Sequence, residues 1–133
     1  MALNRALADT SVFVAQESVH RLSAQGIPPI TVVSVVSLAE LRAGVLSARD
    51  AMTRDRRLET LATAQALQVL VIDEAVAAAW ARLRLFLRDS GRRMPVNDSW
   101  IAATALAGEL AILTQDDDFD AIHGFADLAV IKV

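Results

Sequence analysis

The chain has 133 residues, enough for a single domain with one hydrophobic core. Hydrophobic residues make up 54% of it and aromatic residues only 5%, so the core must be built from Ala, Val, Leu and Ile. A net charge of −3 argues mildly against a non-specific coat for nucleic acid, and the lack of cysteine excludes disulfides and zinc–thiolate sites.

The first element is a predicted strand over about residues 5–9, which turns into a short helix at Thr10 or Ser11. Asp9 lies at this junction and has two interpretations. It can cap the helix, because Asp accepts hydrogen bonds from the free backbone N–H groups of a first turn. It can also be a metal-binding carboxylate at the edge of the sheet. A second helical segment is expected over residues 17–25.

The run 30–36 is rich in β-branched residues and predicts a buried strand. Ser37 is expected to cap the helix that follows, with Glu40 three residues later as in a capping box. Glu40 is therefore either the capping carboxylate or a metal ligand at the same sheet edge. Residues 49–65 form a charged helical stretch, which is typical of a solvated helix face.

Another short strand is expected over residues 67–72, with Asp73 as the cap of the next helix. That helix has one apolar stripe. Leu85 lies opposite the stripe and Phe86 at its margin, which indicates either a subunit contact or simply an exposed leucine. The densest group of arginines lies in residues 82–93.

After Pro95 a helix can start at Asn97 or Asp98, so Asp98 is another acid in a first turn. A short apolar run then begins at Leu110 and stops at a threonine, and four carboxylates follow within five positions. A last strand is expected over residues 128–133. Strands alternate with helices throughout, which predicts a mostly parallel sheet flanked by helices.

Parallel strands place all of these junctions on one side of the sheet, where ligands of open α/β sheets bind. Four acids are expected there: Asp9, Glu40, Asp98 and Asp116. Carboxylate oxygens without Cys or a histidine pair favour Mg²⁺ or Mn²⁺ over zinc. Such an ion can activate water for attack on a phosphodiester. Hydroxyls expected to support the ligands are those of Thr10, Ser11 and Thr114.

At this point the chain resembles a known family, the PIN-domain nucleases, and within it the VapC-type toxins of bacterial toxin–antitoxin pairs. Four motifs in series carry the resemblance, and they span the chain: LADTSV (7–12), SLAELRAG (37–44), NDSWIAATA (97–105) and LTQDDDF (113–119). It implies a PIN-like three-layer sandwich, α/β in class, formed as a single domain over residues 1–133. It also implies a Mg²⁺- or Mn²⁺-dependent endoribonuclease that a cognate VapB-type antitoxin neutralises.

The family's acidic ligands carry over to Asp9, Glu40, Asp98 and Asp116, and Asp118 is a further candidate beside Asp116. VapC-like proteins commonly form homodimers, which Leu85 and Phe86 would fit. With no secretory signal and no apolar run of the roughly 20 residues that cross a bilayer, we expect a cytoplasmic protein without membrane contact.

Three arginines near the acids are candidates to grip the phosphates of an RNA substrate: Arg42, Arg92 and Arg93. Solubility, or pairing with carboxylates of an antitoxin, explains them equally well. The alternative function is a catalytically silent PIN-fold module that binds RNA or protein. A phospho-accepting receiver domain would need a lysine at the acidic edge, and the only lysine, Lys132, is expected inside the apolar run of the last strand.

Overall fold

The computed structural model describes residues 4–17 and 28–133, so the helix predicted over residues 17–25 and His20 lie outside the described residues or at their border. The described elements alternate along the chain. In order, they are β1 (Arg5–Ala8), α1 (Thr10–Ala15), β2 (Ile30–Ser34), α2 (Val35–Leu46), α3 (Ala51–Gln65), β3 (Val69–Leu70), α4 (Glu74–Asp89), α5 (Val96–Ala107), β4 (Ala111–Thr114), η1 (Asp118–Ile122) and β5 (Val130–Lys132).

The five strands form one sheet in the order β3-β2-β1-β4-β5, and every neighbouring pair is parallel. β1 lies at the centre, where Ala8 is in register with Val33 of β2 and with Leu113 of β4. The carboxyl ends of β1, β2 and β4 therefore meet at one edge. The predicted α/β class with a mostly parallel sheet is confirmed.

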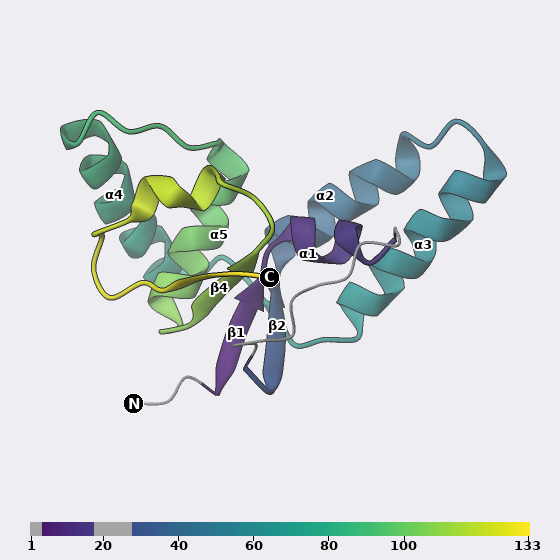
Figure 1. Ribbon diagram of the computed structural model, residues 1–133, viewed down its shortest axis with the longest axis horizontal. Coiled ribbons are helices and arrows are strands. Elements are labelled where there is room, and N and C mark those ends of the chain that lie inside the picture. The colour runs from purple at the N-terminus through teal and green to yellow at the C-terminus, as the bar shows by residue number, and fades with distance from the viewer. Residues whose placement is uncertain (1–3, 18–27) are drawn as a thin grey trace.

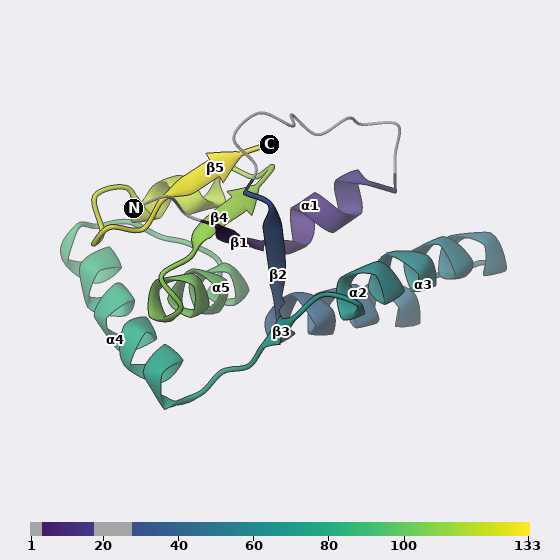
Figure 2. The same cartoon turned by 90° about the horizontal axis from the view of Figure 1, so that it is seen from below.

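Helices cover both faces of this sheet, which gives three layers (Figures 1 and 2). Ala6 and Ala8 of β1 pack with buried residues of α1, α2 and α3 on one face. Leu7, between them in the sequence, packs on the other face with α4, α5 and η1. Successive side chains of a strand point to opposite faces, so residues 6–8 of β1 are all apolar because both faces of the sheet are covered.

The start of α2 differs from the prediction. The helix begins at Val35, and Ser34 caps it by accepting a hydrogen bond from the backbone N–H of Val36 at 3.0 Å. Ser37 is a buried residue inside the helix, so the predicted capping box of Ser37 with Glu40 is wrong. The β-branched run suggested a strand through Val36, but the chain leaves the sheet two residues earlier.

α2 and α3 form an antiparallel pair that projects from the sheet on the side away from α4 (Figures 1 and 2). The Arg57 side chain of α3 donates to the backbone carbonyl of Gly44 at 2.7 Å and joins the two helices. Within residues 4–17 and 28–133, no helix combines the length and apolar character that would let it cross a bilayer.

α4 begins as predicted, with the Asp73 carboxylate accepting from the backbone N–H of Val76 at 2.9 Å. Phe86 packs inside the chain, where its ring lies 5.0 Å from that of Phe125. Phe86 is therefore partly buried against the core, and the expectation that it forms part of a subunit contact is not needed to explain it. Leu85 is 51% exposed.

Candidate active site

A pocket of about 570 Å³ opens at the carboxyl edge of the sheet. We call it the acidic pocket, because all of its charged lining residues are carboxylates: Asp9, Glu40, Asp98, Asp116 and Asp118. In the described part of the chain, no Lys, Arg or His lines it. The four acids predicted from the sequence, which are up to 107 positions apart, are thus brought together, and Asp118 joins them.

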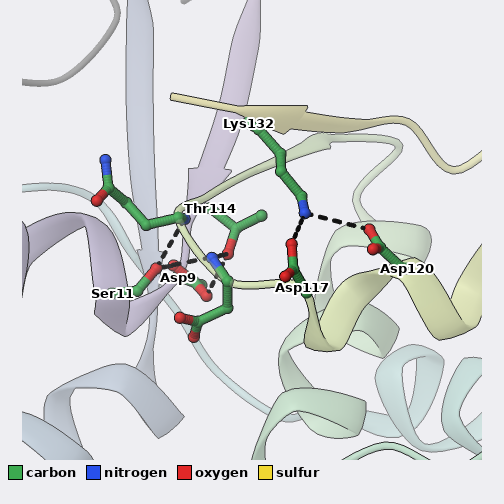
Figure 3. Close-up of polar contacts among 8 residues, drawn as sticks. Asp9, Ser11, Thr114, Asp117, Asp120 and Lys132 are labelled. Atoms are coloured by element: carbon green, nitrogen blue, oxygen red, sulfur yellow. Dashed lines mark hydrogen bonds and ion pairs between the residues drawn. The ribbon is translucent and has the colours of Figure 1, made fainter.

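Asp9 is the most deeply buried of these acids, with 1% of its surface exposed. Although it precedes α1, its side chain makes no capping hydrogen bond. Its carboxylate instead accepts from the Ser11 hydroxyl at 2.5 Å and from the Thr114 hydroxyl at 2.8 Å (Figure 3). Asp9 therefore occupies the N-cap position of α1, but hydroxyls from two elements hold its carboxylate in place of the predicted capping bond.

The same two hydroxyls also fix the acidic turn, which is the segment 115–120 after β4. Ser11 Oγ accepts from the backbone N–H of Gln115 at 2.9 Å, and Thr114 Oγ1 accepts from that of Asp116 at 2.9 Å (Figure 3). Each hydroxyl thus donates to Asp9 and accepts from the turn. This network links Asp9 to the backbone that carries Asp116, so their positions depend on one another.

Glu40 lies in the second turn of α2 and is held across the pocket by α1. The Thr10 hydroxyl donates to Glu40 Oε1 at 2.6 Å and lies 3.0 Å from the Ser37 hydroxyl. Thr10, Ser11 and Thr114 were expected to support the acids, and all three hydroxyls contact one of them or its backbone.

Burial and mutual repulsion disfavour the charged form of several carboxylates in the pocket. Burial, followed by the nearby charges of Asp118, Asp9 and Glu40, raises the pKa of Asp98 to about 7. Burial also raises the pKa of Asp9, despite the opposing hydroxyl hydrogen bonds. The pKa of Asp116 is raised by burial and by Asp118. Carboxylates that repel one another in this way favour a bound cation.

The residues present fit a hard divalent cation in kind, because the pocket offers several carboxylate oxygens and neither sulfur nor imidazole. Their present positions do not yet form a coordination shell. Over the described ranges, no three Asp, Glu, His or Cys side chains are grouped closely enough to hold a metal ion. Asp9 and Glu40 are bonded to hydroxyls instead.

Asp117 differs from its neighbours in the acidic turn. It does not line the pocket but forms an ion pair with Lys132 of β5, whose ammonium also lies 3.5 Å from Asp120 (Figure 3). The side chain of Lys132 is 44% exposed. Lys132 lies in the last strand, as expected, but it is the final residue of that strand and its ammonium reaches Asp117 in the turn after β4. Alternation along β5 could have indicated it, since position 132 ends the strand on an exposed side.

None of the three candidate arginines lines the acidic pocket. Arg42 is exposed on α2. Arg92 donates to the backbone carbonyl of His123 at 2.5 Å and lies over the ring of Phe86. Arg93 lines a neighbouring groove. The pocket also has lining residues that the sequence did not indicate, which are Val14, Pro95, Val96 and Asn97.

Three comparisons place this geometry among known proteins. The family model described as PIN domain matches residues 6–124. Two ribonucleases of Mycobacterium tuberculosis are similar along their length: VapC5 is 47% identical over 94% of this chain and 93% of its own, and VapC4 is 48% identical over the whole of both. The crystal structure of VapBC-5 from the same organism, a member of the VapBC family of toxin–antitoxin systems, superposes with a TM-score of 0.91 at 45% identity, covering 98% of this chain and 99% of that one.

Proposed function

Because the chain belongs to the PIN-domain family and, within it, to the VapC toxins, we propose that it is a metal-dependent endoribonuclease that hydrolyses RNA phosphodiesters at the acidic pocket. The observation that carries the proposal is the convergence of five carboxylates from separate elements on one pocket. The relatives' description as ribonucleases supports the choice of RNA as substrate.

Asp9, Asp98 and Asp116 are the residues that would hold Mg²⁺ or Mn²⁺, with Asp118 assisting. Glu40 would hold a second ion or help to position the attacking water. A bound ion supplies charge neutralisation at the phosphodiester and lowers the pKa of water. The crowding that raises the pKa of Asp98 and Asp116 supports this assignment, since a cation relieves it.

The side chains of the pocket contribute orientation. Thr10 donates to one oxygen of the Glu40 carboxylate and so fixes this lining residue of the pocket. Ser11 and Thr114 hold the two oxygens of Asp9 and leave it little freedom to turn. A carboxylate whose orientation is already fixed loses less entropy when it binds a ligand. Arg42 and Arg93 are exposed, and we propose that they contact substrate phosphates outside the pocket.

We propose a VapB-type antitoxin as the partner that neutralises this chain, supported by its likeness to the VapBC-5 structure. The site of action would be the cytoplasm, where RNA is available. A homodimer is also proposed, with Leu85 as its support in this chain, since its large apolar side chain is half exposed. Leu85→Glu should then lower the mass measured by light scattering without changing the circular dichroism spectrum.

The direct test is cleavage of RNA by the purified protein with Mg²⁺ or Mn²⁺, compared with the same reaction in EDTA. Asp9→Asn should lower the rate by about a thousandfold, because a metal site is worth several kcal/mol of charge stabilisation. Asp55→Asn, a change of the same type at an exposed position of α3, is the matched control and should keep full activity.

Two outcomes would contradict the proposal. Full activity of Asp9→Asn would remove the metal mechanism. Tight Mn²⁺ binding with no cleavage of a broad RNA panel would favour a catalytically silent binding module.

A further inference from the structure

A second groove, of about 560 Å³, lies beside the acidic pocket and shares Val96 with it. All of its charged lining residues are arginines: Arg84, Arg88, Arg92 and Arg93. No Asp or Glu of the described residues lines it. We call it the arginine groove. Two adjoining depressions of opposite charge thus meet at the start of α5.

Most of these positive charges are not neutralised within the chain. Arg88 pairs with Asp89 at 3.2 Å, and across residues 4–17 and 28–133 no other arginine forms an ion pair. Arg92 is fixed by backbone carbonyls, which accept its hydrogen bonds but leave its charge in place. Arginine charges that lack acidic partners are available to an anion from outside.

A pair of stacked indole rings supports the groove wall. Trp80 and Trp100 lie 4.4 Å apart with their planes only 5° from parallel, and Trp80 donates to the Ser99 hydroxyl at 2.9 Å. The guanidinium of Arg84 lies over the Trp80 ring at 5.2 Å. Since Trp80 packs against Trp100 and Arg84, its role is to hold Arg84 at the groove, not to stack on a base.

We propose that the arginine groove binds the backbone phosphates of single-stranded RNA and leads the strand into the acidic pocket. This inference rests on the proposed ribonuclease function and names the surface that supplies its substrate. Phosphates are repelled by five carboxylates, so a substrate needs positive charge close to the pocket to approach it. A single strand can bend into a pocket whose innermost acid, Asp9, is almost fully buried, whereas a stiff duplex cannot.

Leu85, the residue proposed above to support a homodimer, also lines this groove, so a second copy of the chain is the competing occupant. A homodimer through Leu85 agrees with the present proposal only where it leaves the arginines open to RNA. In a two-fold symmetric dimer, the same surface patch meets itself. If such a dimer were centred on the groove, the unneutralised arginines of one copy would lie opposite the same arginines of the other copy. That arrangement is unfavourable without an anion between them, whereas RNA supplies the missing negative charge.

The test measures binding of a fluorescein-labelled single-stranded RNA by anisotropy over a salt series, in EDTA so that no cleavage occurs. The variant is Arg84→Gln with Arg93→Gln; glutamine keeps part of the aliphatic stem over Trp80, and circular dichroism checks the fold. Each lost phosphate contact should reduce the slope of log K against log salt by about 0.7. The matched control removes two arginines from α3, on the far side of the sheet, as Arg54→Gln with Arg56→Gln (Figure 2).

Weaker binding and a shallower slope for the groove variant alone would support the proposal. Equal effects of both variants, or no RNA binding by the wild-type protein, would overturn it. A groove variant that changes the mass in light scattering and leaves RNA binding intact would also overturn it, because the groove would then be a protein contact. Wild-type protein that binds RNA through the groove and does not cleave it with Mg²⁺ or Mn²⁺ would refute the ribonuclease function and leave the groove assignment standing.

Discussion

The acidic pocket and the arginine groove are neighbours that place their charges in different ways. Four carboxylates of the pocket are partly to wholly buried, and burial raises the pKa of three of them, Asp9, Asp98 and Asp116. Hydroxyls of α1 and β4 hold Asp9 and Glu40 in place. The groove cations are exposed side chains of α4 and the loop after it. This difference predicts that mutations can alter cleavage and the proposed RNA binding separately.

Among variants that should alter cleavage and leave RNA binding unchanged, the largest loss of cleavage is expected from Thr114→Val. It removes the hydroxyl that donates to Asp9 and accepts from the Asp116 N–H, while the side chain stays nearly the same size. Removing such a supporting partner typically costs 10–100-fold, so cleavage should fall by about that factor. RNA binding in EDTA should stay at the wild-type level.

The matched control for Thr114→Val is Thr63→Val, which changes a threonine on the exposed face of α3. It should leave cleavage unchanged. If Thr114→Val weakened RNA binding as much as it slowed cleavage, the pocket and the groove would not be separable, and the comparison would fail.

A smaller effect should separate two adjacent acids. Asp118 lines the pocket and Asp117 pairs with Lys132 outside it. We expect Asp118→Asn to slow cleavage by about tenfold, the lower end of what supporting residues contribute. Asp117→Asn loses an exposed ion pair worth at most about 1 kcal/mol in stability, so its cleavage rate should change less than about twofold. Initial rates at one Mn²⁺ concentration decide this, and equal losses would contradict the assignment.

The smallest predicted effect is a shift in thermal stability with pH. The pKa of Asp98 is about 7 in the folded protein against 3.8 as its ordinary value, so the folded state holds an extra proton between these limits. Stability from this group is therefore fully present below about pH 4 and is lost as the pH rises through about 7. In EDTA, Asp98→Asn should gain in melting temperature relative to the wild type over that range.

With Mn²⁺ at neutral pH, the wild type should have the higher melting temperature and Asp98→Asn the lower one, because asparagine offers the ion no charge. The melting temperature of the control, Asp55→Asn, should differ from that of the wild type by the same amount across this pH range. A constant offset for Asp98→Asn as well would show that Asp98 titrates normally.

The sequence predicted the positions of the acids at the sheet edge more accurately than it predicted the ends of the strands and helices that carry them. Asp9 and Asp116 were placed correctly because each follows a short apolar run, and a buried parallel strand ends where polar residues begin. The start of α2 was missed because Ser34 and Ser37 can both cap a helix, and Val35 and Val36 suit a strand equally well. Only the packed sheet decides between these alternatives.

The arginine groove was beyond prediction for a different reason. Its residues come from α4, the following loop and the start of α5, and a patch of arginines in the sequence does not reveal which of them face the same hollow. Arg92 was expected to grip substrate, yet its hydrogen bonds to the backbone near His123 depend on a fold contact across about thirty residues. Such contacts have no local sequence signal.

The central position of β1 has a consequence for how the enzyme is made. Asp9 directly follows β1, but the strand's partner β4 and the turn with Asp116 are more than 100 residues later in the chain. A ribosome adds residues at about 5–20 per second, so β1 emerges seconds before β4 can pair with it. Throughout that interval the nascent chain has no assembled acidic pocket, so the proposed cleavage of RNA has to wait until β4 has been translated.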